Sequence, residues 1–147
     1  MSSLKDKIAS LAADAKFGVS ADQRRLATAE VKLGIIIPSE LREFMKEADG
    51  VKADHGADVI WPISKIESEN LAFRSNPDFR ELYMPFDHLL FFADDGGGDQ
   101  FAFAIHADGQ VHKSDVFRWE HESDGRVWFA TGLSDYLAKR LSESYYE

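Results

Sequence analysis

Four segments place apolar residues at the spacing of one helical face. In the second segment, Ser20 and Gln23 form a capping-box pattern, and Gly34 suits the left-handed position that ends a helix. In the third segment, Pro38 sets the entry of the chain and Ser39 is the expected cap. We therefore predict amphipathic helices over residues 3–15, 20–34, 39–49 and 133–146.

The pattern changes after Gly50, where short apolar runs and turn residues take over. Residues 57–63 are typical of a short strand broken by Pro62, residues 64–75 of one or two helical turns, and residues 74–87 of an irregular connection. The remaining apolar runs predict strands over residues 89–93, 100–105, 110–113, 116–122 and 126–130.

Two Asp-Gly pairs lie between such runs and predict tight hairpins, at Asp108-Gly109 and Asp124-Gly125. A two-residue turn at the second pair would align Trp128 with His121 and Phe129 with Glu120. The two aromatic side chains would then point to opposite faces. A bulge, or a sheet buried on both faces, is needed to accommodate both.

Helices followed by an antiparallel sheet and one closing helix predict an α+β fold. The 147 residues fit one domain, and 44% apolar residues with 11 Phe supply core material. The chain has no Cys, and no run is apolar enough for a secretory signal or a membrane span. We expect a cytoplasmic protein that does not enter a membrane.

Charge favours one class of partner over others. The chain has 26 acidic and 17 basic residues and a formal net charge of -9. A field of this sign repels nucleic acid and attracts basic proteins, although many proteins are acidic for solubility alone. We expect no direct binding of nucleic acid.

The stretch ADDGGGDQ, residues 93–100, has three possible interpretations. A phosphate-binding loop is disfavoured, because Asp99 and Gln100 stand where Lys and Ser or Thr are needed. Asp94, Asp95 and Asp99 are hard oxygen donors for a metal, but their spacing is not that of a calcium loop. We favour a structural turn, formed by Asp94, Asp95, Gly96, Gly97, Gly98 and Asp99, in which the Asp side chains accept backbone N–H groups. We expect no metal and no cofactor.

No pattern of catalytic residues is recognisable in the sequence. Glu120, His121 and Glu122 are the best acid–base candidate, but on an alternating strand His121 would point away from the two glutamates. We therefore expect the protein not to be an enzyme. Acidic residues outside the apolar periodicity, together with one tryptophan, are candidate contacts for a protein partner: Asp54, Asp58, Trp61, Glu120, Glu122 and Asp124. Core packing is the competing interpretation for every tryptophan.

Several segments in a set order resemble the SUKH superfamily of the Smi/Knr type. They are LGIIIPSELREFMKEADG, DVIWPISKI, FFADDGGGDQFAFAI, VFRWEHES and GLSDYLAKRL, and the resemblance as a whole covers roughly residues 22–142. Ala93 stands where the family often has Gly. The resemblance implies one domain over residues 1–147, with residues 1–18 as a helical extension, and a bent antiparallel sheet with helices packed on one side.

The same resemblance implies a function in protein binding. Many bacterial members are immunity proteins that neutralise polymorphic or contact-dependent toxins, often nucleases, whereas fungal relatives act in cell-wall synthesis and signalling. We expect an immunity protein whose partner is a toxin with a basic surface. A regulatory scaffold with an unrelated partner is the alternative.

Overall fold

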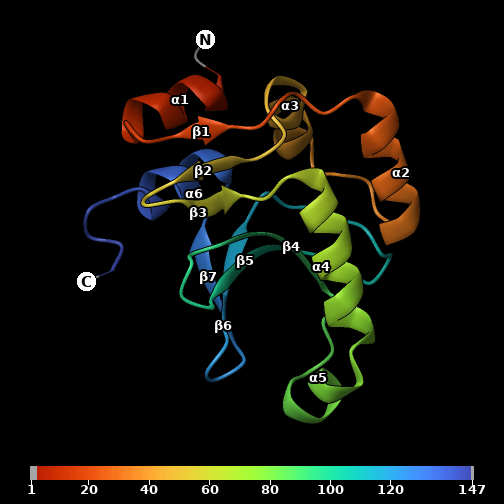
Figure 1. Cartoon of the computed structure of the whole chain (residues 1–147). Helices are drawn as coiled ribbons and strands as arrows, with labels where there is room; N and C mark the ends of the chain where they lie inside the picture. The colour runs from red at the N-terminus through yellow and green to blue at the C-terminus, as the bar shows by residue number, and fades with distance from the viewer. Residues whose placement is uncertain (1–2, 147) are drawn as a thin grey trace.

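The computed structural model describes residues 3–146 and shows two groups of strands with helices around them (Figure 1). The helices are α1 (Leu4–Leu11), α2 (Gln23–Leu33), α3 (Ser39–Glu47), α4 (Ile63–Ser75), α5 (Pro77–Leu82) and α6 (Leu133–Arg140). The strands are β1 (Lys16–Phe17), β2 (Val51–Ala53), β3 (Ala57–Ile60), β4 (Leu89–Asp94), β5 (Gln100–Ala104), β6 (Val116–Glu120) and β7 (Gly125–Ala130).

The strands form two antiparallel sheets, with the orders β1-β2-β3 and β4-β5-β6-β7. The backbone N–H of Trp61, directly after β3, donates to the carbonyl of Phe92 in β4 at 2.8 Å. The predicted α+β class is confirmed. The expected single bent sheet is divided into two sheets that meet at this contact.

Helices contact both faces of the four-stranded sheet, not one. Trp119 and Phe101 belong to neighbouring cross-strand pairs of β5 and β6, so their side chains point to opposite faces. The Trp119 ring contacts Phe73 of α4, with centroids 5.6 Å apart, and the Phe101 ring contacts Tyr136 of α6 at 4.9 Å. This double cover explains why β4 is an almost uninterrupted apolar run.

The sequence predicts only one or two helical turns for residues 64–75, but α4 has 13 residues. The prediction is too short because a buried polar residue, Asn70, interrupts the apolar face of the helix. The amide of Asn70 donates to the carbonyl of Phe91 at 2.8 Å and accepts the N–H of Phe91 at 2.8 Å. It also donates to the carbonyl of Ile66 at 2.6 Å. One side chain thus satisfies the backbone of Phe91 at the edge of β4.

Helix ends differ in detail from the predictions. The carboxylate of Asp22 accepts the N–H of Arg25 at 2.7 Å and caps α2, so Ser20 is not the cap. Gly34 ends this helix with φ 68°, as predicted. Ser39 is the first residue of α3 and makes no capping bond.

The connection between β6 and β7 is longer than predicted. Glu120 pairs with Gly125, so residues 121–124 form a four-residue loop and the two-residue turn is wrong. β7 has one extra residue, Phe129, relative to β6. This bulge is the irregularity that the two adjacent aromatic side chains, Trp128 and Phe129, were expected to need. Phe129 packs against the core, and Trp128 is 48% exposed.

The other Asp-Gly pair forms a turn without a hairpin. His106 exchanges backbone hydrogen bonds with Gly109 and Gln110, but residues 110–115 form no strand. The side chain of Gln110 instead accepts the N–H of Ile36 at 2.9 Å, which holds this segment against the connection between α2 and α3.

Residues 1–18 are not a purely helical extension. Lys16 and Phe17 form β1 and pair with β2, and Ile8 of α1 is completely buried. Met1, Ser2 and Glu147 lie outside the described residues. Within residues 3–146, no helix is both long enough and apolar enough to cross a membrane.

Candidate functional site

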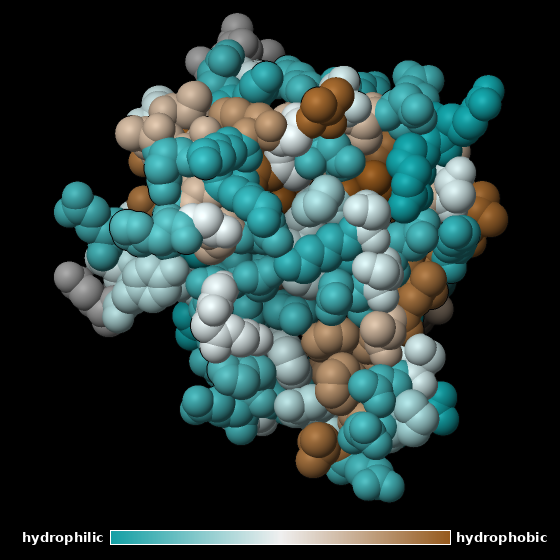
Figure 2. All heavy atoms as spheres, viewed as in Figure 1, coloured by the Kyte–Doolittle hydropathy of each residue, from teal (hydrophilic) through white to brown (hydrophobic). Residues whose placement is uncertain are grey.

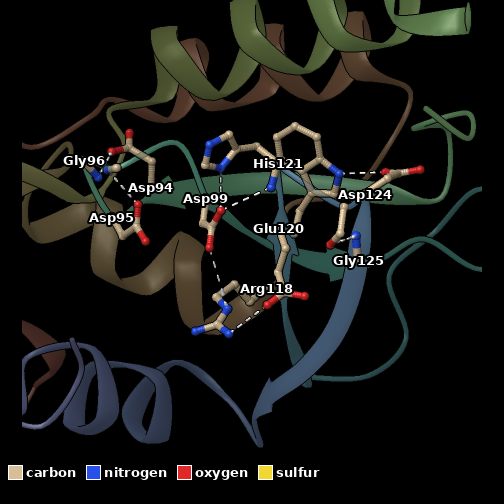
Figure 3. A network of polar contacts seen from close by, with 12 residues as sticks. Asp94, Asp95, Gly96, Asp99, Arg118, Glu120, His121, Asp124 and Gly125 are labelled. Carbon is tan, nitrogen blue, oxygen red and sulfur yellow. Dashed lines mark hydrogen bonds and ion pairs between the residues drawn. The ribbon is translucent and has the colours of Figure 1, made fainter. Parts of the chain in front are cut away.

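The turn between β4 and β5 lies at the same end of the four-stranded sheet as the loop between β6 and β7. This follows from the meander, in which alternate connections share one end. Between them is an open hollow of about 310 Å³ (the close view in Figure 3 covers this region). We call it the acidic hollow, and it is lined by Asp95, Gly97, Asp99, Glu120, His121, Glu122 and Ser123.

The glycine segment is a strand connection closed by its own aspartates. Asp94 accepts the N–H of Gly96 at 2.9 Å, and Asp95 accepts the N–H of Gly97 at 2.8 Å (Figure 3). These are Asx-type turns, and they use side-chain oxygens that a metal would otherwise need.

Two of the three glycines have backbone angles that other residues avoid. Gly96 has φ 80° and Gly98 has φ 110°, whereas Gly97 lies outside the left-handed region. A Cβ on Gly98 would also lie 2.7 to 2.9 Å from the ring of His121. The conformational need for glycine is therefore at 96 and 98, not at 97.

Asp99 and His121 join the two connections directly. One carboxylate oxygen of Asp99 accepts the backbone N–H of His121 at 3.1 Å and contacts its Nδ1 at 2.7 Å (Figure 3). This hydrogen bond, with weaker help from nearby carboxylates, raises the pKa of His121. The same contacts favour the protonated, cationic form of His121 within this carboxylate cluster.

Sequence reasoning misplaced His121. Strand β6 ends at Glu120, so His121 lies in the loop, and alternation along a strand does not apply to it. Glu120, His121 and Glu122 therefore line the same hollow, contrary to expectation. The partner of His121 is Asp99, 22 positions earlier, which no local spacing indicates.

Nearby cations neutralise only part of the negative charge of the four carboxylates in the acidic hollow. Arg118 contacts Glu120 at 3.1 Å and Asp99 at 4.0 Å. Glu122 is exposed and makes no ion pair with any residue from 3 to 146. The hollow therefore keeps a negative charge that faces solvent.

The hollow contains the residue types of a hydrolytic triad, but they are not assembled as one. Asp99 contacts the Nδ1 of His121, while Ser123 Oγ accepts the N–H of Gly125 at 3.1 Å. No hydrogen bond joins Ser123 to His121 in the described chain, and a nucleophile needs that bond to transfer its proton. Nor do residues 3–146 contain a group of three His, Asp or Glu side chains placed to hold a metal ion.

Trp61 is buried at 1% exposure and cannot be an exposed anchor for a partner. Its indole N–H donates to Asp94 at 2.6 Å, which ties the end of β3 to β4. Trp119 is also in the core at 4% exposure, so Trp128 alone of the three tryptophans is substantially exposed.

Asp54, Asp58 and Asp124, three of the acidic residues predicted to contact a partner, form bonds within the protein instead. Asp58 pairs with Lys65 at 2.8 Å. Asp54 accepts hydrogen bonds from Arg140 Nη1 at 2.9 Å and from the hydroxyl of Tyr146 at 2.7 Å, and these bonds lower the pKa of Asp54. The structure brings Glu120 and Glu122 together at the hollow, whereas Asp54 and Asp58 do not line it.

Asp124 holds the β6–β7 loop in place through hydrogen bonds to neighbouring segments. Burial alone would raise its pKa, but hydrogen bonds from the N–H of Met84 and from Trp119 and Arg126 lower it. The indole N–H of Trp119 donates to Asp124 at 2.8 Å. This carboxylate therefore positions Glu122 and His121 and is itself largely hidden.

The sequence matches a known family. The model of the family described as SMI1-KNR4 cell-wall matches residues 23–137, most of the chain. The protein belongs to the SMI1-KNR4 family. No curated protein matches it significantly. In this SMI1-KNR4 domain the matched region contains both connections of the acidic hollow, while α1 and β1 precede it.

Proposed function

We propose that this SMI1-KNR4 domain is a non-catalytic immunity protein that neutralises a basic protein toxin by covering it. The observation that carries the proposal is the exposed acidic hollow, which unites four carboxylates at the tips of two connections. A nuclease that binds phosphate has a basic surface, and an acidic protein can occupy that surface in place of the nucleic acid.

The charge of the whole chain supports the same partner class. A net charge of -9 attracts a basic partner over a range of several ångströms before contact. The unpaired Glu122 at the rim of the hollow is free to meet a partner's Lys or Arg. The paired Glu120 contributes charge but has Arg118 as an internal competitor.

A regulatory scaffold is the second candidate, and the cell-wall description of the matching family favours it. Such a protein would use the same acidic hollow to hold a cellular partner unrelated to toxins. The two functions differ in one consequence, which is survival of cells that express the partner.

Co-expression with the product of the neighbouring upstream gene tests the proposal. We expect a stoichiometric complex in a pull-down and rescue of growth. Glu122→Lys should weaken both, whereas Glu47→Lys, an equal charge change on an exposed residue of α3, should not. Death of cells despite abundant soluble protein would reject the immunity role, and a complex with a non-toxic neighbour would favour the scaffold.

The same preparation tests for catalysis. Because Ser123 is not bonded to His121, we expect no esterase, phosphatase or nuclease turnover above background. Turnover that His121→Ala abolishes would establish an enzyme and overturn the binding-only assignment.

A further inference from the structure

A second hollow, of about 390 Å³, lies between the end of α4, α5 and the segment that follows α5. We call it the aromatic hollow. Apolar side chains gather over this end of the molecule (Figure 2), where Leu82 and Met84 are 69% and 58% exposed. Its lining residues are Phe73, Arg74, Phe79, Arg80, Tyr83, Met84, Pro85, Phe86 and Asp87.

The wall of this hollow is a preformed cluster of rings. Phe73, Phe79, Tyr83 and Phe86 meet edge to face, with successive centroids 4.9 to 5.7 Å apart. The Trp119 ring lies against the same cluster, 5.2 Å from Tyr83. Rings held in this way provide a fixed apolar surface, which is typical of sites for small ligands.

The charge of the aromatic hollow is opposite to that of the molecule as a whole. Arg74 and Arg80 line it with Asp87 as the one carboxylate. Arg74 Nη1 donates to the carbonyl of Leu33 at 3.2 Å, but its Nε and Nη2 are buried without a partner in the described chain. Neither arginine has a carboxylate within 4.0 Å among residues 3–146.

A guanidinium that Asp87 compensates only from a distance, beside an apolar hollow, favours a particular ligand. Burial lowers the pKa of Arg74, which reflects the cost of keeping this cation away from water. A carboxylate would offset that cost, and an attached hydrocarbon group would fill the space between the rings.

We propose that the aromatic hollow binds a small carboxylate that carries an aromatic or branched apolar group. Arg80 is exposed and supplies hydrogen bonds to the carboxylate. Arg74 acts through its charge, because its unpartnered nitrogens face inward. No residue lines both this hollow and the acidic hollow, and the proposal does not rest on the proposed toxin binding.

Three probes with one ring and different charges test this assignment: phenylacetate, phenylacetamide and phenethylammonium. Backbone amide shifts of the folded protein in NMR titrations report both position and affinity. We expect shifts centred on residues 73–87, with phenylacetate binding about threefold to tenfold more tightly than the amide and the cation weakest.

Variants separate the charge effect from simple partition into an apolar space. Arg80→Gln should reduce the advantage of phenylacetate over the amide, and Arg24→Gln, an exposed arginine of α2, should leave it unchanged. The proposal fails if the three probes bind equally, if the shifts lie outside residues 73–87, or if both variants behave alike.

Discussion

His121 joins two loops that are distant in sequence, and its contribution depends on pH. The contact of its Nδ1 with Asp99 raises its pKa above the value of about 6.5 that histidine has in an unfolded chain. A raised folded pKa means that the pair stabilises the fold fully below about pH 6.5. That stabilisation is lost as pH rises through the raised pKa.

The difference in melting temperature between the wild type and His121→Gln should therefore be larger at pH 5.5 than at pH 8.5. Thermal melts of both proteins in matched buffers measure it, and the other histidines cancel because both proteins contain them. A difference that is constant, or larger at pH 8.5, would show that the pair with Asp99 does not form in solution.

The three glycines of the β4–β5 turn should differ in their tolerance of a side chain. Gly98 has φ 110° and its Cβ would meet the ring of His121, so Gly98→Ala should reduce the free energy of unfolding by about 1–3 kcal/mol. Gly97 is outside the left-handed region, and Gly97→Ala should change it by about 0.5 kcal/mol or less. Urea unfolding compares the two, and equal losses would mean that the turn has another conformation.

At the level of elements, α4 shows how one polar residue can substitute for a strand. The amide of Asn70 pairs with the N–H and C=O of Phe91, where a neighbouring strand would otherwise bond. The residue is 1% exposed, so water cannot replace these bonds.

Asn70→Leu should lower the free energy of unfolding by about 2–4 kcal/mol, because it leaves two backbone groups of Phe91 buried and unpaired. Ser68→Ala, on an exposed position of the same helix, should change it by about 0.5 kcal/mol or less. Urea unfolding monitored by circular dichroism measures both. A small loss in the leucine variant would show that the edge of β4 opens to water.

The elements that were predictable are those with a regular apolar period and local end signals. Gly34 ends α2 as its sequence indicates. The length of α4 was not predictable, because Asn70 interrupts its apolar stripe in order to bond the backbone of Phe91 in a distant strand. The β6–β7 turn was misread because Asp124, a typical turn residue, is held by Trp119, Met84 and Arg126 in a longer loop.

At the scale of the whole molecule, the acidic hollow is a product of topology. The sequence shows the acidic residues around the glycine turn and around Glu120, but a meander is needed to bring the two connections to one end of a sheet. Local spacing could place Glu120 and Glu122 on the surface. Trp61 is buried and so cannot contact a partner, and Asp54, Asp58 and Asp124 form bonds within the protein. Both results depend on contacts between distant segments, which composition and periodicity do not encode.

The negative charge of the whole molecule also makes a prediction about association rate. If the proposed basic toxin is the partner, long-range attraction should make association fast at low salt. The Debye length falls from about 10 Å at 0.1 M salt to about 3 Å at 1 M, so the association rate should fall steeply while the dissociation rate changes little. Surface plasmon resonance with the partner measures both rates.

Glu122→Lys should slow association more than Glu47→Lys, although both raise the net charge from -9 to about -7, because Glu122 is unpaired at the rim of the acidic hollow. Glu120→Lys should also accelerate dissociation, since it places a cation beside Arg118 and disturbs the loop itself. An association rate that responds equally to Glu122→Lys and Glu47→Lys would mean that net charge alone steers the partner and that the acidic hollow is not the contact surface.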